Sequence, residues 1–158
     1  NIIDKNAIIP STIAKELALY VVYYSPMQMA ADLPNHYQSH PDAFKFIKKV
    51  PVIWEKKKII NSQIGEYVTI VRKDLNSEDW YLGSITNENE RYFNISLDFL
   101  NENKKYLATI YSDTKNTNWK KNQMEYSIKS IEVNKNSKLD LFLATGGGSA
   151  VQFKEIVD

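Results

Sequence analysis

The sequence contains no cysteine, so neither a disulfide framework nor a thiolate zinc site can form. An oxidising compartment remains compatible, because large secreted domains fold without bridges. Histidine is scarce as well: the chain has only His36 and His40. A four-residue spacing can join two ligands to one metal on a helix, but the metalloprotease glutamate is missing and Pro41 argues against a helix through both. We therefore expect loop histidines and no metal in this chain.

A charge excess of either sign is also lacking. Lysine and arginine total 20 against 19 aspartates and glutamates, a net charge of +1. Such a balance creates no long-range field for nucleic acid or an anionic membrane. The longest strongly apolar stretch, Leu17–Tyr24, is too short to span a bilayer. We expect no nucleic-acid partner and no membrane insertion, and the 43% apolar and 12% aromatic content predicts a packed core.

The first third of the chain has a helical pattern. Ser11 is a suitable N-cap, because its hydroxyl can accept from a free backbone N–H, and Ser25-Pro26 predicts the end. Apolar residues recur at helical spacing between them: Ile13, Leu17, Tyr20, Val21 and Tyr24. Alanine and valine fill much of the opposite side, so the helix is apolar nearly all round and is expected to be buried on several sides.

A strand and a second helix are expected next. Met27–Leu33 is short, follows a helix and stops at Pro34, which favours a buried strand. The second helix is predicted over Pro41–Lys49, with Ser39 or His40 near its cap. Helix, strand and helix make one turn of an α/β unit and not a complete fold. The segment therefore implies neighbours, supplied by upstream sequence or by another subunit.

After Pro51 the pattern changes to short alternating strands at the spacing of a β-sandwich. The expected strands are Ile53–Ile60, Tyr67–Lys73, Trp80–Thr86, Tyr92–Leu97, Tyr106–Ser112, Tyr126–Val133, Leu139–Leu143 and Ala150–Lys154. Gly146–Gly148 lies between two strands and lacks a following Lys-Ser/Thr, so it predicts a tight turn and not a phosphate loop. The fold class is mainly β: an antiparallel β-sandwich preceded by a helix–strand–helix piece.

Three stretches resemble glycoside hydrolase family 97, the α-glucosidases and α-galactosidases of bacterial glycan use. They are Ser11–Pro34 (STIAKELALYVVYYSPMQMAADLP), Ile64–Lys73 continued by Trp80–Asn89, and Leu141–Ala150 (LFLATGGGSA). The resemblance implies that residues 1–50 are the last α/β units of a (β/α)₈ catalytic barrel. It also implies that residues 51–158 are the family's C-terminal antiparallel β-sandwich domain.

The same resemblance implies the activity and surroundings of the intact enzyme. It would hydrolyse α-linked glucosides or galactosides, depend on calcium and lie in the periplasm or be secreted. Its catalytic glutamates precede the matched region, and residues 1–50 hold only Glu16, in the middle of a predicted helix. We therefore expect no catalytic residue and no cofactor in this chain, and no turnover by it alone. Its partners would be the upstream barrel and, for the intact enzyme, an oligosaccharide.

Asp32, Trp119 and Trp80 are the candidate site residues. Asp32 lies at the end of the expected barrel strand, where barrel enzymes place pocket groups, although an aspartate in a loop beside a proline such as Pro34 also commonly bonds loop backbone. Trp119 lies in a polar loop and Trp80 in a strand. Either ring is able to stack on a sugar, and either is equally suited to structural packing.

These tryptophans support an alternative function, a non-catalytic carbohydrate-binding β-sandwich module. A further alternative is a scaffold whose partner covers the first helix. The primary interpretation is a supporting domain of an α-glycosidase.

Overall fold

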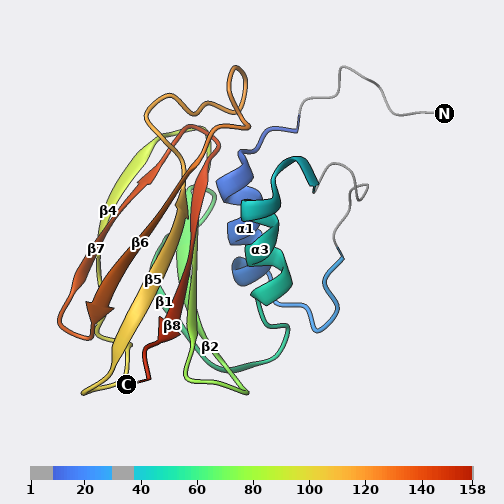
Figure 1. Cartoon of the computed structure of the whole chain (residues 1–158). Helices are drawn as coiled ribbons and strands as arrows, with labels where there is room; N and C mark the ends of the chain where they lie inside the picture. The colour runs from blue at the N-terminus through green and yellow to red at the C-terminus, as the bar shows by residue number, and fades with distance from the viewer. Residues whose placement is uncertain (1–8, 30–37, 158) are drawn as a thin grey trace.

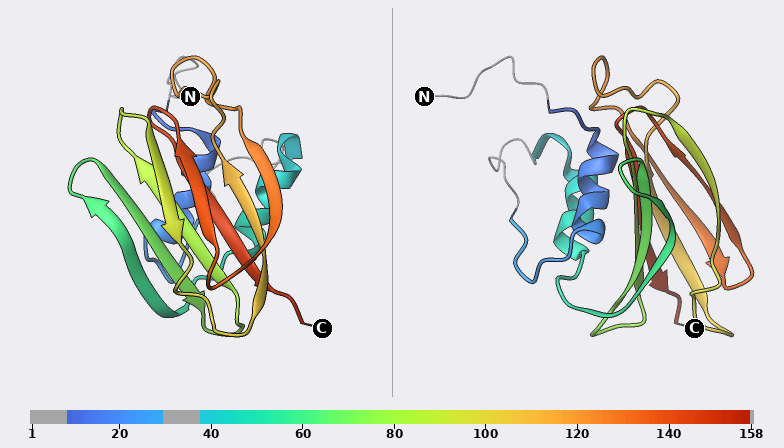
Figure 2. Two further views of the ribbon diagram at one scale, coloured as in Figure 1. Left: turned by 90° about the vertical axis from the view of Figure 1, so that its left-hand side faces the viewer. Right: turned by 180° about the vertical axis from the view of Figure 1, so that it is seen from behind.

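The computed structural model describes residues 9–29 and 38–157. They form three layers: two helices, a six-stranded antiparallel sheet and a two-stranded sheet (Figure 1, Figure 2). The helices are α1 (Ile13–Val22) and α3 (Pro41–Lys49). The large sheet has the order β1 (Trp54–Gln63), β2 (Tyr67–Asp74), β3 (Trp80–Thr86), β8 (Gly148–Glu155), β5 (Lys105–Ser112), β6 (Ser127–Asn134), and the small sheet pairs β4 (Arg91–Ser96) with β7 (Lys138–Leu143).

The main core lies between the two sheets. Alternate residues of β7 point inward because a strand's side chains have a period of two, and Leu139, Leu141 and Leu143 are all buried there. They meet alternate residues of the large sheet, such as Leu82 and Phe153. The predicted antiparallel sandwich is confirmed, with each strand within a few residues of its expected bounds.

A second core lies between the helices and the other face of the large sheet. Phe46 of α3 meets Tyr111 edge to face, with ring centroids 5.3 Å apart. Helix α1 lies so close to β3 that a Cβ at Gly83 would be 2.6 Å from the carbonyl oxygen of Ala18. Glycine is therefore needed at position 83 for the helix to rest on the sheet.

Helix α1 begins and ends slightly inside its predicted limits. Thr12, and not Ser11, is the N-cap, and its Oγ1 accepts from the Lys15 N–H at 3.2 Å. At the other end Arg72 of β2 is buried and donates to the carbonyl oxygens of Val21 and Val22 at 2.6 and 3.3 Å. A buried cation at a helix C-terminus satisfies carbonyls that the helix leaves unpaired.

The predicted buried strand over Met27–Leu33 is wrong for the residues that can be compared. Met27–Met29 have irregular backbone, and Met27 and Met29 are 76% and 77% exposed. Residues 30–33 lie outside the described residues. The large sheet is on the far side of the helices (Figure 1), so no described strand offers hydrogen-bond partners to this segment.

Candidate functional site

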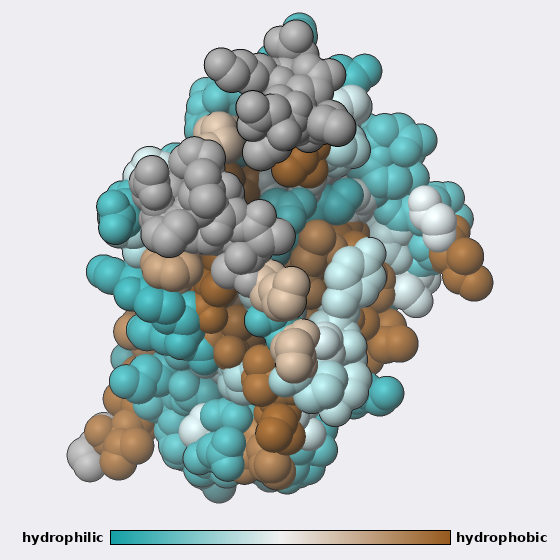
Figure 3. Space-filling view, turned by 90° about the vertical axis from the view of Figure 1, so that its right-hand side faces the viewer, coloured by the Kyte–Doolittle hydropathy of each residue, from teal (hydrophilic) through white to brown (hydrophobic). Residues whose placement is uncertain are grey.

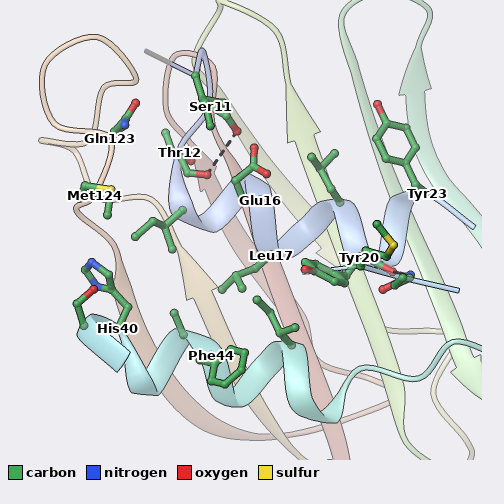
Figure 4. Close-up of a pocket in the computed structure, with 18 of the residues that line it drawn as sticks. Ser11, Thr12, Glu16, Leu17, Tyr20, Tyr23, His40, Phe44, Gln123 and Met124 are labelled. Carbon is green, nitrogen blue, oxygen red and sulfur yellow. Dashed lines mark hydrogen bonds between the residues drawn. The ribbon is translucent and has the colours of Figure 1, made fainter. Parts of the chain in front are cut away.

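The outer face of the two helices carries a groove with a volume of about 780 Å³. Its lining is largely apolar and includes Ile13, Leu17, Tyr20, Phe44 and Ile47. Apolar side chains gather on this side of the molecule (Figure 3), and the close-up in Figure 4 shows both helices contributing to the groove. An exposed apolar patch of this kind is typical of an interaction surface.

Helices α1 and α3 run in the same direction. At their beginnings, the Ile13 N–H donates to the Gln123 carbonyl at 3.1 Å, and the Tyr126 hydroxyl donates to Asp42 at 2.6 Å. At their ends, Arg72 of β2 donates to the last carbonyls of α1, and the Tyr81 hydroxyl of β3 donates to the Lys49 carbonyl of α3 at 3.1 Å. Arg72 and Tyr81 are paired between β2 and β3. Consecutive parallel helices require a return segment between them, as in a βα-repeat.

A buried carboxylate fixes the start of α1 to the sheet. Asp113 is 3% exposed, and its Oδ2 accepts from the N–H groups of Ala144 and Gly148 at 2.9 and 2.8 Å. Burial raises the pKa of Asp113, while the Thr12 side chain, the two N–H groups and the Lys15 charge oppose that rise. Lys15 also donates to the Thr86 carbonyl at 2.9 Å. These contacts join α1, β3, β5 and the turn before β8.

The start of α3 depends on Tyr126, and we expect Tyr126→Phe to raise the pKa of Asp42. The Tyr126 hydrogen bond is the main reason that this pKa lies below its ordinary value. A lowered folded-state pKa contributes stability above the unfolded pKa, and this is lost as pH falls through the folded value. NMR titration of Asp42 checks the shift, and an unchanged pKa in the Tyr126→Phe variant would contradict the assignment.

The candidate site residues fall in different places. Asp32 lies outside the described residues. Trp80 is 5% exposed, with its ring centroid 5.2 Å from that of Phe99 in the sandwich core. Of the two alternatives stated for Trp80, sugar stacking and structural packing, the structure shows packing, because the second sheet covers its ring. Trp119 is half-buried in the loop between β5 and β6.

Sequence reasoning missed Asp113 and Arg72. Their partners are distant in the chain, and no local motif marks either residue.

His40 is the N-cap of α3, and its Nδ1 lies 3.4 Å from the Tyr126 hydroxyl. Within residues 9–29 and 38–157, no group of three or more histidines, aspartates or glutamates is arranged to hold a metal.

The described residues thus form an antiparallel sandwich that carries two parallel helices with an apolar groove on their outer face, the architecture of a β-sandwich domain with a helical N-terminal segment. Residues 53–154 match the family described as "Glycosyl-hydrolase 97 C-terminal, oligomerisation". The chain belongs to glycoside hydrolase family 97 and corresponds to its C-terminal part.

Several relatives agree with this placement. A retaining alpha-galactosidase of Bacteroides thetaiotaomicron is 34% identical over 143 residues, which is 90% of this chain and 21% of that protein. A family 97 enzyme from Pseudoalteromonas sp. strain K8, solved with acarbose, is 45% identical with a TM-score of 0.92 over 94% of this chain and 23% of its own. A beta-arabinopyranosidase shares the fold, at 24% identity and a TM-score of 0.73 over 90% of this chain and 21% of its own.

The chain thus spans about a fifth of the length of the relatives it matches. Neither of the described helices has the length and apolar character needed to cross a bilayer.

Proposed function

We propose that this chain supports the catalytic barrel of a family 97 α-glycosidase, and that the intact polypeptide hydrolyses α-linked galactosides or glucosides. The single observation that carries the proposal is the pair of parallel helices held on the sheet with an apolar groove on their outer face. In this view α1 and α3 are the last helices of a (β/α)₈ barrel, residues 1–50 complete the barrel and residues 51–158 brace it.

The relatives support the substrate class. One is named a retaining alpha-galactosidase, and others were solved with acarbose or panose. Glycoside hydrolysis needs a pair of carboxylates flanking the scissile bond. Among the described residues the buried carboxylate of Asp113 lies inside the domain, on the sheet side of α1, and bonds backbone N–H groups. We therefore place both catalytic carboxylates upstream. Asp32 remains a candidate for lining the sugar pocket.

Calcium is proposed for the intact enzyme only. Ca²⁺ takes six to eight oxygen ligands, and the described residues hold no acidic cluster that fits it. Asp113 already accepts two N–H bonds beside Lys15, which does not suit a cation. We propose a periplasmic or secreted location from the family resemblance alone, with cell fractionation of the source bacterium as its measurement.

Activity assays on two lengths of polypeptide test the proposal. The 158-residue chain should release no sugar from p-nitrophenyl α-galactoside or α-glucoside, whereas the polypeptide extended upstream to the family's full length should hydrolyse one of them. Robust hydrolysis by the short chain, abolished by Asp32→Asn, would overturn the proposal, as would an inactive full-length polypeptide that is folded.

A charge placed in the groove tests the bracing contact. Tyr23 lines the groove and is 65% exposed, so Tyr23→Glu should leave the stability of the short chain nearly unchanged. In the full-length polypeptide the same charge would be buried without a partner, and we expect a loss of at least about 2 kcal/mol of stability. The matched control is Tyr92→Glu on the opposite sheet, where Tyr92 is 63% exposed. Equal effects of the two changes in the full-length protein would contradict the groove contact.

A further inference from the structure

The loop between β5 and β6 stands at the beginnings of both helices. We call residues 114–126 the Trp119 loop. Its Gln123 carbonyl accepts from the Ile13 N–H at 3.1 Å, and its Tyr126 hydroxyl donates to Asp42 at 2.6 Å. Figure 4 shows Gln123 and Met124 beside the start of α1 and close to His40, which precedes α3. The loop is therefore tied to the N-terminal ends of α1 and α3.

In a (β/α)₈ barrel, the N-terminal ends of the helices lie at the face that carries the active site. Each barrel helix begins just after the C-terminal end of a strand, and active sites lie at that face. If α1 and α3 are barrel helices, as proposed above, the Trp119 loop stands at the rim of the catalytic face and not at the opposite end. The C-terminal domain then borders the side from which substrate enters.

The loop has a fixed shape. The Thr117 hydroxyl accepts from the Thr114 N–H at 2.8 Å and donates to the Glu125 carbonyl at 2.9 Å. The Glu125 carboxylate also accepts from Asn122 at 2.5 Å and from the Thr114 hydroxyl. A loop held by its own hydrogen bonds loses little entropy when it binds a ligand.

Trp119 is half-buried and held in place within this loop. Its ring lies against the turn before β8, where a Cβ on Gly146 would approach Trp119 Cδ1 to 2.5 Å, and Gly146 has a φ of +68°. The Lys120 ammonium lies 5.0 Å from the ring centre. Residues 119–124 line a depression of about 270 Å³.

The chemistry of this depression suits a neutral sugar. An indole can stack on the C–H groups of a pyranose once the exposed, flexible Lys120 side chain moves off the ring. The Asn122 amide nitrogen is already bonded to Glu125 and the Gln123 amide to backbone carbonyls, so Lys120 and Lys121 are the exposed donors. Hydroxyl groups need such polar partners around an apolar platform.

We propose that the Trp119 loop is a distal subsite of the intact enzyme, binding sugar units remote from the cleaved bond of an extended α-linked oligosaccharide. The inference rests on the proposed function, since only the barrel gives the loop a catalytic face to border. A short substrate occupies the active site without reaching the loop, whereas a longer one contacts both.

Steady-state kinetics of the full-length polypeptide test this. The substrates are a p-nitrophenyl α-glycoside and an oligosaccharide of about five or six sugars, verbascose for galactoside cleavage or maltohexaose for glucoside cleavage. For Trp119→Ala we expect KM on the oligosaccharide to rise about three- to ten-fold, the value of one aromatic ring contact. The kcat and KM for the aryl glycoside should not change.

Two further variants separate binding from structure. Trp119→Phe keeps a ring and should restore most of the oligosaccharide KM, and Tyr92→Ala on the opposite sheet should leave both substrates unaffected. An unchanged oligosaccharide KM in Trp119→Ala, or an equal rise in KM for both substrates, would overturn the subsite. Either result leaves the proposed function intact, because the proposed function fails only when the unmodified full-length polypeptide cleaves neither substrate.

Discussion

Replacing Asp113 with alanine is expected to lower the free energy of unfolding by about 2–4 kcal/mol, since two buried N–H groups lose their acceptor. Those groups belong to Ala144 and Gly148, on either side of the turn that leads into β8. The same change removes the carboxylate beside Lys15 at the start of α1. Urea unfolding followed by tryptophan fluorescence measures the loss.

The matched control is Asp113→Asn, which keeps one oxygen for the two N–H groups and removes the charge. We expect Asp113→Asn to cost far less stability than Asp113→Ala, and an equal cost would show that the charge and not the hydrogen bonds matters.

The pH dependence of stability gives a second measurement of the role of Asp113. Because the folded-state pKa is raised above the ordinary 3.8, the protonated form is favoured in the fold. The protonated Asp113 therefore contributes its full stability below pH 3.8, and this contribution is lost as pH rises through the folded-state pKa. The Asn variant should lack this decline.

Gly83→Ala is expected to cost about 2–3 kcal/mol, because the added methyl group overpacks the interface between α1 and β3. Its Cβ would lie 2.6 Å from the Ala18 carbonyl oxygen and 3.0 Å from the Val21 Cβ. Both neighbours belong to the helix and neither is the far end of a flexible side chain, so α1 must move away from the sheet.

Gly65→Ala provides the comparison for that measurement. Gly65 lies in the turn between β1 and β2 with a φ of +78°, and a Cβ there meets nothing within 4 Å. Only the left-handed backbone is penalised, at about 1 kcal/mol. If urea unfolding gave Gly83→Ala a cost no larger than that of Gly65→Ala, the close seating of α1 on β3 would be refuted.

The sequence was sufficient for the strands and for α3. Alternation in segments such as Leu139–Leu143 marks a half-buried strand, and Pro41 and Pro51 bracket the second helix. These are local signals, in which each residue's neighbours along the chain report its surroundings. The resemblance to family 97 rests on Ser11–Pro34, Ile64–Asn89 and Leu141–Ala150, and the family is confirmed by the match over residues 53–154.

The remaining features depend on contacts between distant segments. Successive strand residues such as Trp80 and Tyr81 point to opposite faces of the sheet, but no local signal shows that both faces are covered. Asp113 resembles an ordinary turn aspartate until the turn before β8 is placed against it. The site on the helices was foreseen only as a need for neighbours, because a groove shared by α1 and α3 has no sequence motif.

The position of β8 in the large sheet sets an order for assembly. β8 is the last described strand to leave the ribosome, yet it lies between β3 and β5. Before it emerges, β1–β3 and β5–β6 are two ribbons with no strand hydrogen-bonded to both of them, and α1 lacks the surface around Gly148 on which it begins. Helix α1, translated early, can therefore complete its packing only after β8 has been translated. Contacts between segments so far apart in sequence form slowly. Nascent chains stalled before β8 should therefore leave α1 accessible to protease long after it has been translated.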